Sequence, residues 1–536
     1  MSAGAGESRS REVYREAESV PAPPPPKPLP AQDEQRHWLW QNLQEAGDAQ
    51  RAGSTLERFL AAETTAEALQ LWLGSWIPED KRQLALRLNR DVLLIDELIN
   101  AQLNAILHHP KFQQLESSWR GLKYLVERVD EEEAANVKIR VLNVSRRELE
   151  RDFERAIEFD QSQLFRKVYE DEFGRPGGEP FGLLIGDFEF HPRVTPEHPH
   201  DDMSLLRNLA QVAAAAFCPF VAASAPAMFG LDDFSDLEVT IDHERTFSAL
   251  EYLNWQNLRR MEEARFVGLT MPRVLMRVPY DVDCSPEYRR DNPNAERFHF
   301  REDVSGPDRS KYLWGNASYA FAGVVIRAFV TSGWFADIRG VQRGVDGGGL
   351  VTDLPVHSFS TDKNGVAIKS STDVVITDTL EKQLSELGFM ALCDCQDTEY
   401  SAFYSAHSIQ KPERYDRPEA TRNAEISSRL QYMLCVSRFA HYIKVLGRER
   451  LGVFQDAQEF QHALHNWLFR YVTSDSEASM ETKARHPLRE ARVQVTDTPG
   501  QPGAFQCVMH LSPHFELERM VASVRLATEI APPRAP

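Results

Sequence analysis

The chain has 536 residues, 42% of them hydrophobic and 26% charged, which is typical of a folded globular protein and argues against global disorder. Its formal net charge of −19 argues against a nucleic-acid partner, because phosphate binding needs concentrated Lys and Arg. No apolar run reaches the roughly 20 residues that cross a bilayer, and the charged N-terminus lacks a signal peptide's apolar stretch, so we expect a cytoplasmic chain without direct membrane insertion.

The N-terminal part divides into two segments. Residues 1–33 are rich in proline and poor in large apolar side chains, so we expect a flexible arm. Residues 34–130 show a helical pattern, clearest over 82–107, where apolar residues recur at three- and four-residue steps. We expect this helical region to bind a partner. Its tryptophans are candidate anchors, with a place in the core as the equal alternative: Trp38, Trp40, Trp72 and Trp76.

Residues 131–485 alternate between strand-like and helix-like patterns, which predicts an α/β fold. Short apolar runs predict strands over residues 137–144, 181–187, 273–278 and 374–376. Helical periodicity predicts helices over residues 145–173, 203–216, 319–330 and 421–446.

Residues 486–536 have the pattern of strands. Apolar residues alternate with polar ones on both sides of a turn-rich TPGQPG segment, which predicts a hairpin, and a third alternating run follows. A strand edge at the end of a chain recruits another strand unless it is blocked, so we expect inter-subunit strand exchange here. The residues expected to support it are Val493, Val495, Phe505, Cys507, Met509, Ala522, Val524 and Leu526.

Candidate metal ligands are densest between the predicted strand over 181–187 and the next helix. They are Glu189, His191, Glu197, His198, His200, Asp201 and Asp202. Three prolines interrupt the segment and the spacing is irregular, so a solvated loop before a helix is favoured over a zinc site. The pair Cys393 and Cys395 has no second paired motif, and six cysteines in so long a chain make no disulfide framework, which favours packed thiols.

Two other segments contain residue types found in binding or catalytic sites. The glycines at 344 and 347–349 fit no phosphate-loop motif, which favours a tight or mobile turn. Asp353, His357 and Asp362 lie near Ser358 and Ser360, but no nucleophile elbow accompanies them. We therefore expect no catalytic site, no metal and no cofactor. A soluble hydrolase or metal enzyme using residues 353–362 or 191–202 remains the alternative.

Several long segments have sequences that are more specific than these short motifs. In chain order they are residues 109–126 (HPKFQQLESSWRGLKYLV), 264–280 (ARFVGLTMPRVLMRVPY), 312–321 (YLWGNASYAF), 334–341 (WFADIRGV), 349–362 (GLVTDLPVHSFSTD), 372–390 (TDVVITDTLEKQLSELGFM), 408–413 (SIQKPE), 427–446 (SSRLQYMLCVSRFAHYIKVL) and 500–515 (GQPGAFQCVMHLSPHF). Together they resemble the large subunit of the type VI secretion contractile sheath, the TssC/VipB family, and the resemblance spans about residues 106–526.

The resemblance implies a mixed-sheet core like that of phage-tail sheath proteins, with C-terminal strands exchanged between subunits. It implies a heterodimer with a small sheath subunit, TssB/VipA, and helical polymers around an Hcp inner tube above baseplate components. The charged stretch before the terminal strands is a candidate tube contact, with a solvated helix face as the alternative: Glu477, Glu481, Lys483 and Arg485.

One feature departs from the family pattern. Many members have a short amphipathic N-terminal helix that the AAA+ unfoldase ClpV recognises, whereas residues 10–20 here have a thin apolar face that does not match. The sequence therefore does not decide whether ClpV recycles this sheath. A sheath protein of a related contractile particle without a separate small subunit is a further alternative.

Overall fold

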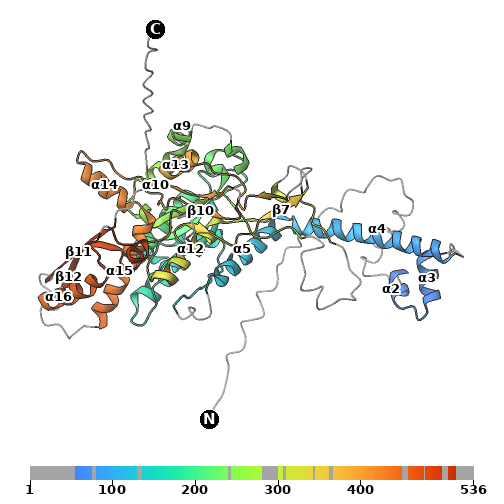
Figure 1. Cartoon of the computed structure of the whole chain (residues 1–536), viewed down its shortest axis with the longest axis horizontal. Helices are drawn as coiled ribbons and strands as arrows, with labels where there is room; N and C mark the ends of the chain where they lie inside the picture. Colours follow the sequence, from blue (N-terminus) through green and yellow to red (C-terminus); the bar gives the residue numbers. More distant parts are fainter. Residues whose placement is uncertain are drawn as a thin grey trace, which may run out of the picture. The chain divides into compact units, whose positions relative to one another are not determined.

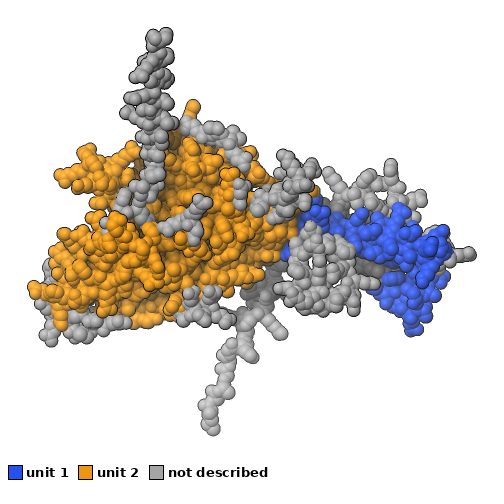
Figure 2. Space-filling model, in the orientation of Figure 1, with its two compact units in different colours: residues 1–109, 280–303 blue, residues 110–279, 304–536 orange. Residues whose placement is uncertain are grey.

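The computed structural model describes residues 55–74, 80–129, 136–238, 243–280, 300–305, 309–341, 345–360, 366–396, 398–449, 457–475, 477–497 and 505–514. The chain forms two compact units (Figure 2). Unit 1 comprises residues 1–109 and 280–303, and unit 2 comprises residues 110–279 and 304–536. No helix among the described residues is both long enough and apolar enough to span a bilayer.

Unit 1 is helical where it is described. Its helices are α2 (Thr55–Leu60), α3 (Thr65–Leu73) and the 27-residue α4 (Lys81–Leu107). The Asp80 carboxylate caps α4 by accepting a hydrogen bond from the Arg82 N–H, which satisfies a backbone donor that has no partner inside the helix. The indole N–H of Trp72 donates to Asp91 at 3.0 Å and ties α3 to α4. The helix predicted over residues 82–107 is thus confirmed.

The second stretch of unit 1 packs on the end of α4. The Asp303 N–H donates to Asn104 Oδ1 at 2.8 Å, and Glu302 lies 3.4 Å from His108. These contacts attach residues 300–303 to the last turns of the helix, although nearly 200 residues separate them in sequence.

Unit 2 contains a six-stranded sheet in the order β1-β2-β3-β9-β10-β6. The four strands from β1 to β9 run parallel, and β10 and β6 continue the sheet antiparallel, so the sheet is mixed as expected. The strands are β1 (Leu184–Phe190), β2 (Phe220–Ser224), β3 (Val267–Met271), β6 (Leu350–Val351), β9 (Phe389–Asp394) and β10 (Ser401–Phe403).

Both faces of this sheet are buried. In β9, Phe389, Ala391 and Cys393 belong to one apolar cluster, whereas Met390 and Leu392 belong to another. Successive side chains of a strand point to opposite faces, so the two clusters lie on the two sides of the sheet. A continuous apolar run such as FMALC is what a strand covered on both faces requires.

A helix covers each face. Helix α8 (Asp202–Ala216) supplies much of the first cluster, and α12 (Ala317–Ser332) supplies much of the second. Helix α5 (Pro110–Glu127) packs on α12, and a Cβ added at Gly121 would lie 2.5 Å from the Tyr319 ring. Only glycine at that position permits so close an approach of the two helices.

The remaining elements of unit 2 surround the sheet. The helices are α6 (Arg146–Arg155), α7 (Gln163–Phe165), α9 (His243–Ser248), α10 (Leu253–Arg259), α13 (Asp378–Glu386), α14 (Pro418–Ser427) and α15 (Leu430–Glu449). Of these, α10 and α15 contribute buried side chains to the core around the sheet. Two small antiparallel pairs join β4 (Val274–Leu275) to β5 (Trp314–Gly315), and β7 (His357–Ser360) to β8 (Val366–Lys369).

The C-terminal part of unit 2 has its own apolar cluster. This part of the chain contains α16 (Ala457–Leu468), the six-residue α17 (Met480–Arg485), and the antiparallel pair β11 (Leu488–Asp497) and β12 (Phe505–Pro513). The hairpin lies beside α16 in Figure 1, and the Trp334 ring stacks on Phe439 at 4.3 Å within the same cluster.

Several predicted elements are confirmed and others are wrong. Helices predicted over 203–216 and 319–330 correspond to α8 and α12, and the strand over 181–187 appears as β1. No strand forms at 137–144 or 374–376, and the strand over 273–278 shrinks to β4. The helix over 145–173 is broken into α6, α7 and a π-helical turn, and that over 421–446 divides at residues 428–429. The division into segments 1–33, 34–130, 131–485 and 486–536 stays a prediction.

Candidate functional site

The C-terminal hairpin has the register that the alternating sequence predicts. Val493 lies opposite Met509, and Val495 lies opposite Cys507. Phe505 lies opposite Asp497 at the turn end of β12. Ala522, Val524 and Leu526 lie outside the described residues.

The two faces of the hairpin differ. Ala491, Val493 and Val495 are buried, and they pack with Cys507 and Met509 in the C-terminal apolar cluster. The intervening residues of both strands are exposed: Arg492, Gln494, Thr496, Val508 and His510. One face therefore anchors the hairpin to the rest of unit 2, and the other faces solvent. Burial raises the pKa of the Cys507 thiol, so it stays protonated at neutral pH.

The two edges of the hairpin also differ. On β11, the Val495 N–H donates to Gln461 Oε1 at 3.0 Å, and the Thr473 N–H donates to the Leu488 carbonyl at 2.9 Å. Strand β12 pairs with β11 on one side, and within the described residues no strand pairs with its other side. Pro513 stands only at its end, so the open edge of β12 has no internal block.

The charged candidates for tube contact lie just before the hairpin. Glu481 and Arg485 are exposed on α17 and pair with each other at 2.9 Å, one helical turn apart. Glu477 is exposed ahead of the helix and Lys483 is half-buried on it. The charged stretch expected to be helical, residues 474–489, forms a helix only over residues 480–485, and β11 already begins at Leu488.

Of the tryptophan anchors, Trp72 is described and is half-buried, with its indole N–H bonded to Asp91 and its ring 5.3 Å from Phe59. Trp38, Trp40 and Trp76 lie outside the described residues. The role of all four as partner anchors stays a prediction.

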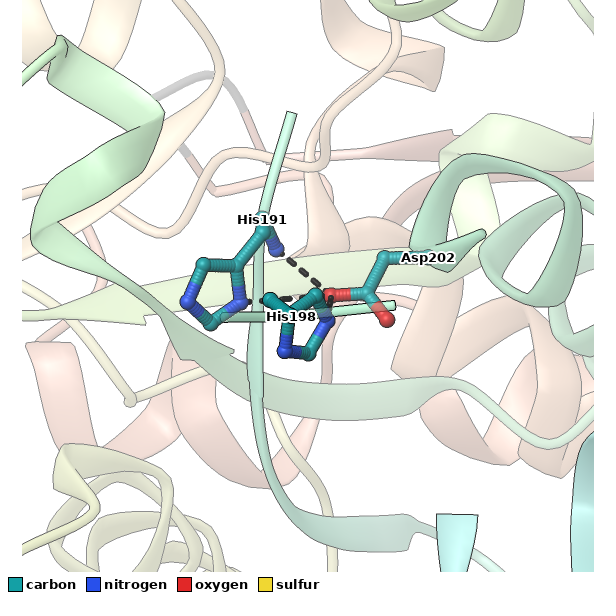
Figure 3. Close-up of side chains that lie close together, drawn as sticks. All are labelled: His191, His198 and Asp202. Atoms are coloured by element: carbon teal, nitrogen blue, oxygen red, sulfur yellow. Dashed lines mark hydrogen bonds and ion pairs between the residues drawn. The ribbon is translucent and has the colours of Figure 1, made fainter. Parts of the chain in front are cut away.

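A second polar constellation lies where β1 ends and α8 begins. Asp202, 2% exposed, accepts a hydrogen bond from the His191 backbone N–H at 2.7 Å, and its carboxylate lies 3.0 Å from His198 Nε2 (Figure 3). The two imidazole rings stack at 3.9 Å. The predicted loop before a helix is confirmed, with Asp201 capping α8 and Asp202 in its first turn. The loop is not solvated throughout, because part of it folds back on the buried Asp202 carboxylate.

Arg146 completes this cluster from α6. Its Nη1 lies 2.8 Å from His198 Nε2 and 3.1 Å from Asp202 Oδ1. Burial opposes ionisation of Asp202, but the hydrogen bonds from His191 and the Arg146 charge outweigh it and lower the pKa of this carboxyl. Burial lowers the pKa of His198, so its neutral form is favoured.

The geometry can be tested against a metal. His191, His198 and Asp202 each offer a ligand atom, and these atoms lie within 4.8 Å of one another. A cation among them would have to displace the Arg146 guanidinium, which already contacts two of the three groups. Three other candidates have partners elsewhere: Glu189 pairs with Arg273 at 2.6 Å, His200 with Glu150 at 2.8 Å, and Asp201 accepts from the Ser204 N–H at 3.2 Å. Glu197 is exposed. The cluster fits a structural link between α6 and α8 better than a metal centre.

The comparisons with known proteins cover most of the chain. The model of the VipB family matches residues 89–410 as its tail sheath N-terminal domain, and a second VipB model matches residues 419–530 as a tail sheath gpW/gp25-like domain. The type VI secretion system sheath protein TssC1 of Pseudomonas aeruginosa is 40% identical over 442 residues, which are 82% of this chain and 85% of that protein. The chain belongs to the TssC/VipB family of type VI secretion sheath large subunits.

A solved structure of the anti-feeding prophage baseplate is also similar, with 12% sequence identity and a TM-score of 0.33 over 61% of this chain and 67% of that one. The first VipB match covers the six-stranded sheet, and the second covers the segment from α14 to β12. The family is one of structural sheath proteins, which agrees with the non-enzymatic function predicted from sequence.

The loop considered for hydrolysis does not assemble a catalytic set in the part that is described. Asp353 pairs with Arg128 at 2.5 Å, which lowers the pKa of its carboxyl, whereas His357 Nδ1 lies 3.0 Å from the Tyr312 hydroxyl. Asp362 and the side chains of Ser358 and Ser360 lie outside the described part. Asp353 and His357 thus contact different partners.

The cysteine and glycine motifs have structural contacts. Cys393 is buried in the sheet core, and burial raises the pKa of its thiol, which keeps it protonated. The Gly348 N–H donates to Asp337 Oδ2 at 3.0 Å, and its φ of +63° suits glycine. A Cβ added at Gly349 would lie 2.0 Å from the Phe403 carbonyl oxygen, so this glycine allows the loop to reach β10.

Proposed function

We propose that the chain forms heterodimers with a small sheath subunit of the TssB/VipA type, and that these heterodimers polymerise around an Hcp tube and contract to propel it. The open edge of β12 carries this proposal. A two-stranded hairpin is marginal by itself in water, so a third strand on its free edge would add both stability and a link between subunits. Family membership supplies the context for that link.

The incoming strand is expected on β12. Contacts from Gln461 and Thr473 occupy backbone groups of β11, whereas the open side of β12 offers a row of donors and acceptors. The run Ala522, Val524 and Leu526 of a neighbouring copy, or a strand of the small subunit, would pair there. Main-chain hydrogen bonds would then keep the lattice connected while the subunit cores change their packing.

Helix α4 offers a surface for the small subunit. Val92, Ile99 and Ile106 follow one another at seven-residue intervals and are 54%, 41% and 43% exposed. Leu86 and Leu93 form a second row with the same spacing, about 100° around the helix, and are 70% and 63% exposed. A seven-residue repeat of exposed apolar residues is typical of a seam that another helix covers. This stripe agrees with the partner-binding role predicted for residues 34–130.

Contraction is a change of packing between rigid bodies in this account. The sheet of unit 2 is buried on both faces, so it would move as one body, and the extended sheath would be the higher-energy state. The polar surface of α17, with Glu481 and Arg485, is a contact with the tube that could break on firing. The assembly would lie in the cytoplasm on a baseplate, and recycling by ClpV stays open.

The proposal is tested by co-expressing the full chain with a small subunit of the TssB/VipA type and examining the product by negative-stain electron microscopy. Hollow tubules that require both chains would support the heterodimeric sheath. Tubules from this chain alone would favour a related contractile particle without a small subunit. Soluble monomers under all conditions would contradict a role in assembly.

A further inference from the structure

Strand β1 is an open edge of the main sheet. It pairs with β2 on one side, and no strand pairs with its other side within the described residues. Of its seven residues only Gly186 and Phe190 are buried, whereas β2 and β3 are buried throughout. Strand residues point their backbone groups alternately to the two edges, so part of the β1 backbone faces this open side.

A strand-like segment lies close to that edge without pairing. Residues 137–144, VKIRVLNV, have the β-branched composition of a strand, yet no backbone–backbone hydrogen bond joins them to another described residue. Ile139, Val141 and Leu142 are 36%, 69% and 50% exposed. This exposure is costly for an isolated chain, and it is what a surface covered in an assembly would show.

Side-chain contacts set the direction of this segment relative to β1. Lys138 and Arg140 both pair with Glu179, and Arg140 lies 5.5 Å from the centre of the Phe181 ring. Further along, Arg146 donates to the Glu189 carbonyl at 2.6 Å. Residues 138–146 therefore run alongside residues 179–189 in the same direction. The contacts between them come from long side chains and involve no ladder of backbone bonds.

We propose that the outer edge of β1 and residues 137–142 together dock a β-strand of the small sheath subunit, which extends the main sheet by strand addition. The inference rests on the proposed heterodimer and assigns it a second surface, distinct from the C-terminal hairpin. Backbone groups of β1 on the open side supply the hydrogen bonds, apart from the Glu189 carbonyl that Arg146 already occupies. Ile139, Val141 and Leu142 supply apolar contacts on the flank of the added strand.

We expect the docked strand to come from another polypeptide, because the rest of this chain has no further strand-like run for this edge. Outside the described residues, the strand-like run found in the sequence is Ala522, Val524 and Leu526, which follows β12. That run is placed to serve the hairpin edge of a neighbouring copy. Residues 1–33 are instead rich in proline, residues 34–54 have a helical pattern, and residues 281–299 are mostly polar, so none of them has the pattern of a strand.

The experiment is hydrogen exchange on the full chain, alone and in complex with the co-expressed small subunit. Complex formation should slow exchange at least about tenfold in residues 137–144 and 184–190, because pairing protects backbone amides. Val141→Asp should weaken the complex at least about tenfold, or ~1.4 kcal/mol, by placing a charge on the flank of the new strand. Ile157→Asp is the matched control, because Ile157 is 89% exposed elsewhere on unit 2.

Each outcome separates this inference from the proposed function. Tubules that form with no added protection in these segments, and with Val141→Asp binding like wild type, would overturn the docking edge and leave the sheath proposal standing. Two results with the chain alone would overturn the proposal. Protection that disappears when the chain is truncated after His514 would indicate an internal strand. Protection that grows with the concentration of the chain would indicate a second copy. No complex with the small subunit would instead contradict the heterodimer itself.

Discussion

The central strand β9 and the terminal strand β12 meet the same requirement in different ways. In β9, residues 389–393 are all buried, and the strand has neighbours on both sides, β3 and β10. In β12, exposed and half-buried residues alternate over 507–512, and one side pairs with β11 while the other has no strand within the described residues. The first strand completes a core within one chain, whereas the second leaves an open side that a neighbouring chain would complete in the proposed assembly.

The difference indicates how a sheath subunit divides its stability. The main sheet carries the folding energy of unit 2, because both of its faces bury large apolar clusters. The open edges of β12 and β1 should contribute little to the stability of the isolated subunit. They would stabilise the assembly by pairing with strands of other chains. Substitutions in the two kinds of region should therefore separate loss of folding from loss of assembly.

The largest effect is expected in the main core. Trp255 is 1% exposed and stacks on Phe389 at 5.5 Å, so Trp255→Ala should destabilise the chain by about 3–5 kcal/mol through lost burial and a residual cavity. Chemical denaturation followed by circular dichroism measures this loss. Leu250→Ala is the control, because Leu250 is 84% exposed and should change stability by less than about 0.5 kcal/mol. Equal effects of the two substitutions would contradict the assignment of the core.

The next effect is on assembly with folding retained. Met509→Pro removes a backbone donor from β12 opposite Val493, so tubules should disappear while the denaturation midpoint of the main core stays nearly unchanged. Electron microscopy of co-expressed chains measures the first and circular dichroism the second. His510→Ala, which keeps the backbone donor at the neighbouring exposed position, should still assemble. Normal tubules from both Met509→Pro and Val495→Pro would refute strand exchange at the hairpin.

A smaller effect is expected from the α4 stripe of unit 1. Ile99→Asp places a charge in the middle of the exposed apolar seam and should weaken binding of the small subunit about tenfold. Quantitative co-purification or interferometry measures the change. Ala101→Asp adds the same charge to an exposed position outside the seven-residue repeat and should bind normally. Unchanged binding of Ile99→Asp would show that the seam has another occupant.

The smallest effect is a pH dependence of the core. Burial lowers the pKa of His441, whose Nε2 lies 3.0 Å from the Ala216 carbonyl, and Arg438 and Lys444 lower it further. The unfolded chain then binds the proton more readily below the ordinary value of 6.5, so stability should fall as the pH decreases from about 7 to 5. Thermal melts at several pH values should show a shallower decline for His441→Gln than for wild type. A steeper decline in that variant would contradict a lowered pKa of His441.

The sequence alone predicts the elements in which local pattern and packing agree. The alternation around the TPGQPG turn predicted the hairpin, and the helical stripes predicted α4, α8 and α12. Val374 and Ile376 are buried while Val375 is 47% exposed, so this segment has a strand's alternation without a pairing neighbour. Pairing is a tertiary property, and a single sequence does not show whether a neighbouring strand is available.

The same limit applies to the polar clusters. His191, His198 and Asp202 are candidates from sequence alone. The sequence does not show that Arg146, more than forty residues earlier, contacts both His198 and Asp202. The absence of a ladder at residues 137–144, where sequence predicts a strand, is informative in its own right. The pattern fits a strand that is completed by another chain.

Cryo-electron microscopy of the co-expressed tubules, at a resolution that shows side chains, tests the account most directly. We predict a continuous sheet in which a strand from a neighbouring subunit pairs with β12, and a strand of the small subunit pairs with β1. A map in which both edges face solvent while the subunits contact one another through other surfaces would contradict the account.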